Sequence, residues 1–204
     1  MLRYLACIAV AAPLVHAQSE KPKWYEEMKI GPAWSNTFED SFQGTKRVAA
    51  LKGILLDLGE KHRALFDTET LRLVNAYQGE PDKEGEPKKS DFNWGGTPWT
   101  GAHGPLISLK DENAIFNTEA LPGWADAKGS FKDKREIPGV GNLDYASFKG
   151  YYRHGDKIVL NYNVNGAEIL ETVSAENGVI TRSFKIAKRS ADLLLIVADE
   201  KGGF

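Results

Sequence analysis

The chain of 204 residues has a single cysteine, Cys7, which lies in an apolar N-terminal segment. Once that segment is removed, the rest of the chain has no disulfide, thiolate nucleophile, cysteine metal ligand or covalent c-type haem site. A domain of this length can be held together by its apolar core alone. We therefore expect a fold stabilised by packing and hydrogen bonds, and no cofactor is assigned.

The chain also lacks an excess of positive charge. It carries 26 lysines and arginines against 28 aspartates and glutamates, with no basic stripe. Proteins that bind nucleic acid use such a stripe to neutralise phosphates, so nucleic acid is not an expected partner. Beyond the N-terminal segment no apolar run is long enough to cross a bilayer, so we expect no transmembrane segment after its cleavage.

Short catalytic signatures are missing as well. The sequence contains no GxSxG, no HExxH, no phosphate-binding GxxxxGK[ST] and no GxGxxG after a strand. Apart from His16 in the N-terminal segment, the histidines are His62, His103 and His154, and no two of them have a metal-ligand spacing. No catalytic residue and no metal ligand is assigned.

The N-terminal segment itself, MLRYLACIAVAAPLVHA, has the parts of a secretory signal peptide over residues 1–17. Arg3 precedes an apolar run from Tyr4 to Val15, and Val15 and Ala17 occupy the positions that a signal peptidase reads. Cleavage after Ala17 would leave a periplasmic or extracellular protein. Secretion is consistent with the size and composition of the remaining chain.

The C-terminal third predicts an antiparallel meander. Alternate apolar residues from Ile158 to Val164 indicate a half-buried strand. The pairs Asn165-Gly166 and Asn177-Gly178 supply the positive φ angles of tight hairpin turns, and His154-Gly155-Asp156 predicts another turn. With strands further upstream the total is roughly eight to ten at turn spacings of 8–12 residues, which favours a sandwich over a barrel. The predicted fold class is an all-β antiparallel β-sandwich with long irregular loops and a short N-terminal helical arm.

Residues 18–44 are predicted to form this arm, and residues 45–204 a single β-sandwich domain. Within the arm WYEEMK, residues 24–29, predicts a short helix that stops before Gly31-Pro32. Trp24 and Trp34 are expected to anchor the arm to the domain. Disorder of the arm is the alternative.

Two apolar runs follow the arm, bounded by Gly59 and by the turn Asp67-Thr68-Glu69-Thr70. Leu71, Leu73 and Tyr77 keep a period of two and are expected on one face, while Asn75 is expected to meet solvent or a ligand. Asp67 and Glu69 would suit a glycosidase only if two carboxylates faced each other across a cleft. The simpler interpretation is that Asp67 accepts backbone hydrogen bonds within its turn.

The stretch from 79 to 104 predicts a long loop whose second half, FNWGGTPWTGAHG, is aromatic. Flat rings on a stiff loop stack on sugar faces, and nearby polar groups bind hydroxyls. The competing interpretation is a lid whose indoles are turned inward, because tryptophan is usually buried. The candidate ligand-binding residues are Tyr77, Asn93, Trp94, Trp99 and His103.

A second irregular region extends from Asn117 to Ala146. Its aspartates would pair with Arg135 and Arg153, or these arginines would bind an acidic sugar. The C-terminal run LLLIVADEKGGF has more apolar residues than one buried face needs, which predicts a central strand or an edge awaiting a neighbour.

Several phrases of the chain resemble an uncharacterised N-terminal domain family of large secreted bacterial multidomain proteins. They are KGILLDLG with LFDTETLRLVNAYQG, the WGGTPWTGAHG loop, and KGYYRHGDKIVLNYNVNGAEILET. The resemblance implies an exported β-rich module, often followed by sugar-dehydrogenase-like propeller and c-type cytochrome domains. This chain contains no haem-binding CxxCH, so no electron-transfer role is carried over.

These observations favour an exported non-catalytic module for carbohydrate recognition or interdomain docking in a larger cytochrome- or dehydrogenase-like system. Its possible partners are a carbohydrate ligand and downstream propeller or cytochrome domains. The alternative is a polysaccharide-active enzyme, a glycoside hydrolase or lyase, that uses loop carboxylates.

Overall fold

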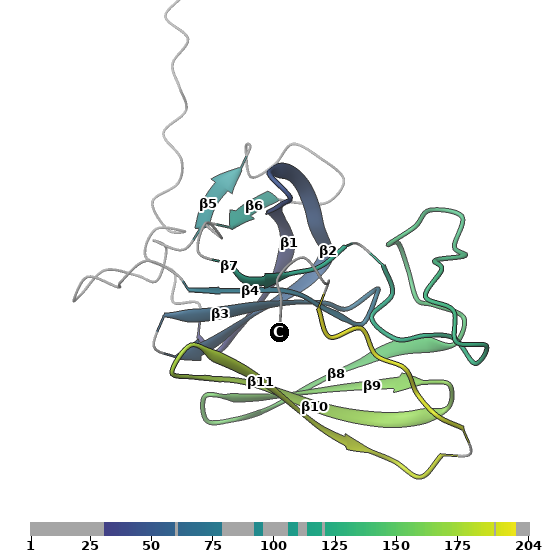
Figure 1. Ribbon diagram of the computed structural model, residues 1–204. Coiled ribbons are helices and arrows are strands. Elements are labelled where there is room, and N and C mark those ends of the chain that lie inside the picture. Colours follow the sequence, from purple (N-terminus) through teal and green to yellow (C-terminus); the bar gives the residue numbers. More distant parts are fainter. Residues whose placement is uncertain are drawn as a thin grey trace, which may run out of the picture.

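A computed structural model describes residues 31–59, 61–78, 92–95, 106–109, 114–119, 121–189 and 191–198. Over these residues the chain forms strands in two sheets and no helix, so the expected all-β class is confirmed. Figure 1 shows the larger sheet above the smaller one. The predicted signal peptide and the helix expected at residues 24–29 lie outside the described residues.

The larger sheet has seven strands in the order β5-β6-β1-β2-β3-β4-β7. Every pairing in it is antiparallel except that of β1 with β6, which is parallel. Its strands are β1 (Ala33–Phe42), β2 (Thr45–Gly59), β3 (His62–Asp67), β4 (Arg72–Gln78), β5 (Phe92–Gly95), β6 (Leu106–Leu109) and β7 (Ala114–Asn117).

The smaller sheet is an antiparallel meander in the order β11-β10-β9-β8. It contains β8 (Ala146–His154), β9 (Lys157–Val164), β10 (Ala167–Glu176) and β11 (Val179–Ile186). The predicted turns connect them: Asn165-Gly166 and Asn177-Gly178 have φ of 49°, 80°, 51° and 78° in chain order. These positive angles match the right-handed twist of the flanking strands, which is why the local sequence predicted this sheet well.

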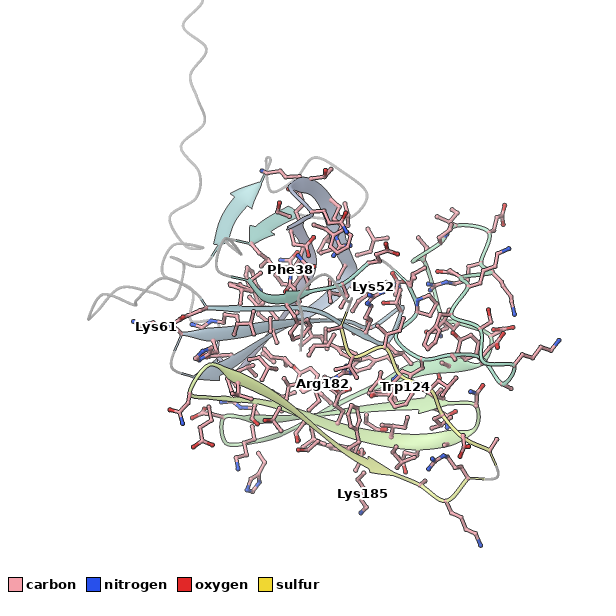
Figure 2. All side chains as sticks on the ribbon, in the orientation of Figure 1. Phe38, Lys52, Lys61, Trp124, Arg182 and Lys185 are labelled. Carbon is pink, nitrogen blue, oxygen red and sulfur yellow. The ribbon has the colours of Figure 1, made fainter. Side chains whose placement is uncertain are left out.

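The two sheets share one apolar core, which we call the intersheet core. The rings of Phe66 on β3 and Tyr162 on β9 stack across it with centroids 5.8 Å apart, and Figure 2 shows side chains filling the space between the sheets. Its strand residues include Ile54, Leu56, Ala64, Phe66, Leu73, Ile158, Leu160, Tyr162, Val164 and Ile169.

The opposite face of the seven-stranded sheet carries a second core. Alternation along β2 shows the division, because Ile54 and Leu56 enter the intersheet core while Leu55 enters the second core. The second core contains Phe38, Ala49, Ala50, Leu55, Leu65, Val74, Tyr77 and Leu109. The large sheet is therefore apolar on both faces, which explains its nearly continuous buried runs along β3 and β4.

The prediction that Leu71, Leu73 and Tyr77 lie on one face of the sheet was wrong. Leu73 lies in the intersheet core, whereas Tyr77 lies in the second core on the other side of the sheet. The reason is a bulge: Leu65 faces Asn75 and Phe66 faces Leu73, so Val74 is an extra residue on β4. One inserted residue shifts the alternation by one and sends the following side chains to opposite faces.

Asn75 also departs from its expected contact with solvent or a ligand. Its side chain is fully buried, and its amide nitrogen donates to Asp40 Oδ2 over 2.9 Å. Arg47 binds the same carboxylate through Nε over 2.7 Å and reaches the Asn117 amide oxygen over 3.0 Å. Asn75 therefore belongs to a buried polar network that ties β1, β2, β4 and β7 together.

Ten of the 27 residues of the expected N-terminal arm are part of the sheet. Residues 33–42 form β1, which lies between β6 and β2 rather than on the surface of a finished domain. Turn residues in this segment obscured its strand character in the sequence. Trp34 does act as an anchor, since it packs against the second core and meets the Phe38 ring edge-on at 5.6 Å.

Over its described residues, 193–198, the C-terminal run is not a regular strand, in contrast to the expectation of a central or edge strand. Trp124 and Leu195 form a single bridge, while Leu193 and Leu195 pack on the intersheet core. The intervening Leu194 and the following Val197 are each 51% exposed. The run thus closes one side of the core with alternate residues and leaves the others on the surface.

Candidate functional site

Only some of the site residues predicted from the sequence lie in the described part of the structure. Trp99 and His103 lie outside the described residues. Asn93 and Trp94 lie on β5, where they pair with Ser108 and Ile107 of β6, so a strand occupies part of the expected loop. Tyr77 is on β4, four strands from β6, and its side chain is fully buried in the second core.

The turn carboxylates Asp67 and Glu69 are enclosed rather than arranged across a cleft. Asp67 Oδ1 accepts the Glu69 backbone N–H over 3.0 Å, and Oδ2 accepts the Thr70 hydroxyl over 2.6 Å. The predicted turn-capping role of Asp67 is confirmed. Burial outweighs these hydrogen bonds and raises the pKa of Asp67 to about 6.

Glu69 joins this turn to the second irregular region. One oxygen, Oε1, accepts the Gly141 backbone N–H over 2.7 Å and pairs with Lys52 Nζ at 3.0 Å. Arg135 donates to the Glu69 carbonyl over 2.9 Å and also binds Asp133 and the Gly141 carbonyl. These contacts make the cluster a clasp that fixes the loop on the sheet.

In the described part of the chain, a pocket of about 660 Å³ at one end of the intersheet space is a candidate ligand site. It forms where two hairpins separate. The pairing of β10 with β9 ends at Glu171 and Leu160, whereas β10 stays paired with β11 up to Glu176 and Val179. The β8–β9 pair meanwhile continues to His154 and Lys157.

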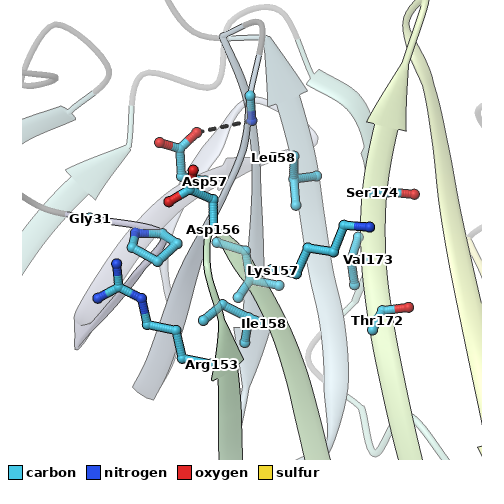
Figure 3. Close-up of a pocket in the computed structure, with 13 residues that line it drawn as sticks. Gly31, Asp57, Leu58, Arg153, Asp156, Lys157, Ile158, Thr172, Val173 and Ser174 are labelled. Atoms are coloured by element: carbon cyan, nitrogen blue, oxygen red, sulfur yellow. Dashed lines mark hydrogen bonds between the residues drawn. The ribbon is translucent and has the colours of Figure 1, made fainter.

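Part of the seven-stranded sheet closes the base of this opening. The end of β2 lines it together with Pro32, whose carbonyl accepts the Asp57 backbone N–H over 3.0 Å. Figure 3 shows the pocket between these segments. Its apolar lining consists of Pro32, Leu56, Leu58, Ile158 and Val173.

The polar lining comes from three separate segments. Its members are Asp57, Arg153, Asp156, Lys157, Thr172 and Ser174. In Figure 3 the Lys157 side chain extends from β9 towards β10, and Arg153 lies on the other side of Ile158. Beyond Glu171 the edge of β10 that faces β9 has no strand pairing among the described residues, so backbone groups also border the pocket.

The charges of this lining differ in how firmly they are held. Asp57 Oδ1 accepts from Arg63 Nη1 over 2.8 Å and from the Gly59 N–H over 3.0 Å. Arg153 Nε donates to the Gly155 carbonyl over 2.9 Å. The remaining charged groups, Asp156 and Lys157, are exposed. The pocket can therefore offer an apolar surface, an unpaired backbone edge and exposed charged groups to one small ligand.

Sequence reasoning missed this pocket because its walls are far apart in the chain. The sequence left open whether Arg153 pairs with aspartates or binds an acidic sugar, and nothing local links it to Leu56 or Ser174. The one sequence feature that could have located part of the pocket is the turn His154-Gly155-Asp156. This turn brings Arg153 and Lys157 to the same end of a hairpin.

Two other kinds of site would need clustered metal ligands or a long apolar helix in the described part of the chain. No group of three or more His, Cys, Asp or Glu side chains is arranged there to hold a metal ion. Nor does that part include a helix long and apolar enough to cross a membrane.

Fold and pocket together define an all-β protein with a pocket open between two sheets. Residues 64–171, just over half of the chain, match the family described as Domain of unknown function (DUF6797), and the chain belongs to this family. The match is consistent with the resemblance to an uncharacterised domain family. No curated protein and no solved structure matches the chain significantly.

Proposed function

We propose that the chain is an exported, non-catalytic β-sandwich module that recognises carbohydrate in the pocket between its sheets. The supporting observation is the chemistry of the pocket lining, in which an apolar wall stands beside charged groups and an unpaired backbone edge of β10. A sugar ring has the complementary surface, with C–H groups on its face and hydroxyls on its rim. Such a mixed lining fixes orientation through a few polar contacts while the apolar wall excludes water.

The contacts of the carboxylates support recognition rather than hydrolysis. A glycosidase needs two carboxyl groups facing each other across the scissile bond, one of them able to hold a proton. Asp57 is instead held in an ion pair with Arg63, whose Nη1 lies 2.8 Å from its Oδ1. Asp67 and Glu69, the carboxylates suggested by the sequence, serve the clasp. A glycoside hydrolase or lyase is the alternative, and it would have to rely on Asp156 and a loop carboxylate.

Docking of a neighbouring domain is a second candidate function. Leu194 and Val197 are large apolar residues left on the surface by the C-terminal run. A module cut from a larger protein would expose such residues at its interface. The resemblance to modules that precede propeller and cytochrome domains supports the same idea.

The proposal is tested by screening the exported protein against soluble and insoluble polysaccharides. Intrinsic tryptophan fluorescence reports binding, and reducing-sugar release reports hydrolysis. N-terminal sequencing of the exported protein should begin at Gln18 if the signal is cleaved after Ala17. Binding without release is the expected result; release would establish the enzymatic alternative.

A matched pair of substitutions connects binding to the pocket. Lys157→Trp places an indole in the opening and should abolish binding, whereas Lys188→Trp, at an exposed lysine outside the lining, should leave it unchanged. Absence of binding to every polysaccharide would reject recognition and leave docking as the function.

A further inference from the structure

The charge balance of the pocket favours an anionic ligand. Among its lining residues Arg153 and Lys157 are positive and Asp57 and Asp156 are negative. The charge of Asp57, however, is already compensated by Arg63, which is nearly buried beside it at 2.8 Å. Counting Arg63, the site carries one net positive charge.

The two cations also have free donors. Arg153 uses only Nε, in its hydrogen bond to the Gly155 carbonyl. Over the part of the chain that the structure describes, neither its two Nη groups nor Lys157 Nζ has a hydrogen-bond partner. The Gly155 contact holds one edge of the guanidinium at the hairpin turn and leaves its outer edge for a ligand. A guanidinium edge matches the two oxygens of a carboxylate.

The rest of the lining suits the body of a sugar. Leu58, Ile158 and Val173 form the apolar wall, and the backbone edge of β10 that β9 leaves open beyond Glu171 offers N–H and C=O groups to ring hydroxyls. Asp156, in the turn between Arg153 and Lys157, is a further acceptor for ring hydroxyls. An apolar face, hydrogen-bonding partners for sugar hydroxyls and the outer edge of the Arg153 guanidinium are thus present in a single cleft.

We infer that the ligand of this pocket is a carboxylated sugar, a uronic-acid residue of an acidic glycan. Arg153 binds the carboxylate of one residue while the apolar wall takes the ring face, and Lys157, on the other side of Ile158, binds the carboxylate of a neighbouring residue of the glycan. A phosphate or sulfate polyanion fits less well, because the single net positive charge and the adjacent Asp156 favour a singly charged group. This inference rests on the proposed carbohydrate-recognition function and names its ligand class.

The test uses trigalacturonate and its fully methyl-esterified form, which differ in charge while sharing the same sugar backbone. Calorimetric titration of the exported protein should show binding of the acid and at least tenfold weaker binding of the ester, about the loss expected for a charge-assisted hydrogen bond. Affinity for the acid should also fall with added salt.

Substitutions give an independent readout. Arg153→Gln and Lys157→Gln should each weaken trigalacturonate binding about tenfold. The matched controls Arg189→Gln and Lys185→Gln remove exposed cations outside the lining and should have no effect. Asp156→Asn should strengthen binding of the acid, because it removes a like charge, and should not strengthen binding of the ester.

The outcomes separate this inference from the function on which it rests. Equal binding of acid and ester, or binding unaffected by Arg153→Gln, would overturn the uronic-acid assignment and leave neutral carbohydrate recognition intact. Binding of neither compound, together with a negative screen of neutral polysaccharides, would reject both. Should the acid bind equally well to Asp156→Asn and to the unchanged protein, loss of its binding in Arg153→Gln would still support the contact between Arg153 and the carboxylate.

Discussion

Arg182 on β11 donates through Nε to Glu171 Oε1 on β10 over 2.6 Å, and both side chains are buried. The second oxygen of Glu171 accepts the Tyr162 hydroxyl from β9, also over 2.6 Å. Burial, followed by the nearby Glu171 charge, raises the pKa of Tyr162 far above its usual range, so the phenol stays a donor. Glu171 therefore links three strands at the last pair before β9 and β10 separate.

Breaking this link should destabilise the protein strongly. Glu171→Gln removes the charge that Arg182 needs and should cost about 3–5 kcal/mol of unfolding free energy, as for other buried ion pairs that lose one partner. Chemical denaturation followed by circular dichroism measures it. The double variant Glu171→Leu with Arg182→Met should be more stable than Glu171→Gln, because no buried charge is left alone. A single variant as stable as the unchanged protein would show that the pair has no such role.

Asp67 should give the protein an unusual dependence on pH. Its pKa is 3.8 in the unfolded chain and about 6 in the folded protein, so the folded state binds the proton more tightly. Its stabilising contribution is therefore complete below about pH 4 and is lost as the pH rises through 6, a loss of about 3 kcal/mol. Asp67→Asn should abolish this slope.

The measurement is the unfolding free energy of both proteins between pH 4 and pH 7. The pKa values of Asp126 and Asp133 are lowered to about 2 by hydrogen bonds from Lys134 and Arg135 respectively, so their contributions change only at lower pH. Parallel curves for the two proteins would contradict the assignment. Thr70→Val, which removes a hydrogen bond that lowers the Asp67 pKa, should steepen the slope and provides a second check.

Two glycines should differ in their tolerance of a methyl group. A Cβ on Gly123 would lie 2.3 Å from the Leu71 carbonyl oxygen, a backbone atom. On Gly53 the nearest atom is Phe38 Cδ2 at 2.6 Å, which belongs to a side chain. Gly123→Ala should therefore lower the unfolding free energy by several kcal/mol, and more than Gly53→Ala, since a backbone carbonyl cannot rotate away. Thermal melts of the two variants decide this, and equal melting temperatures would refute it.

Local sequence was a good guide where local geometry decides the structure. Asn165-Gly166, Asn177-Gly178 and the Asp67–Thr70 turn all occur as predicted, because positive φ angles and side-chain hydrogen bonds to nearby N–H groups require particular residues at particular positions. The alternation from Ile158 to Val164 likewise gave the buried face of β9. Along β4 the same reasoning failed, since the bulge at Val74 is visible only in the pairing with β3.

The sequence by itself determined an all-β chain with a legible four-stranded meander, since hairpin turns and period-two alternation are properties of neighbouring residues. Tertiary structure alone decided that residues 33–42 join the large sheet, that Tyr77 is buried, and that a pocket opens between Leu58, Arg153 and Ser174. Those outcomes depend on which strands meet and where their pairing stops. Contacts between residues more than a hundred positions apart have no periodic signature in one sequence.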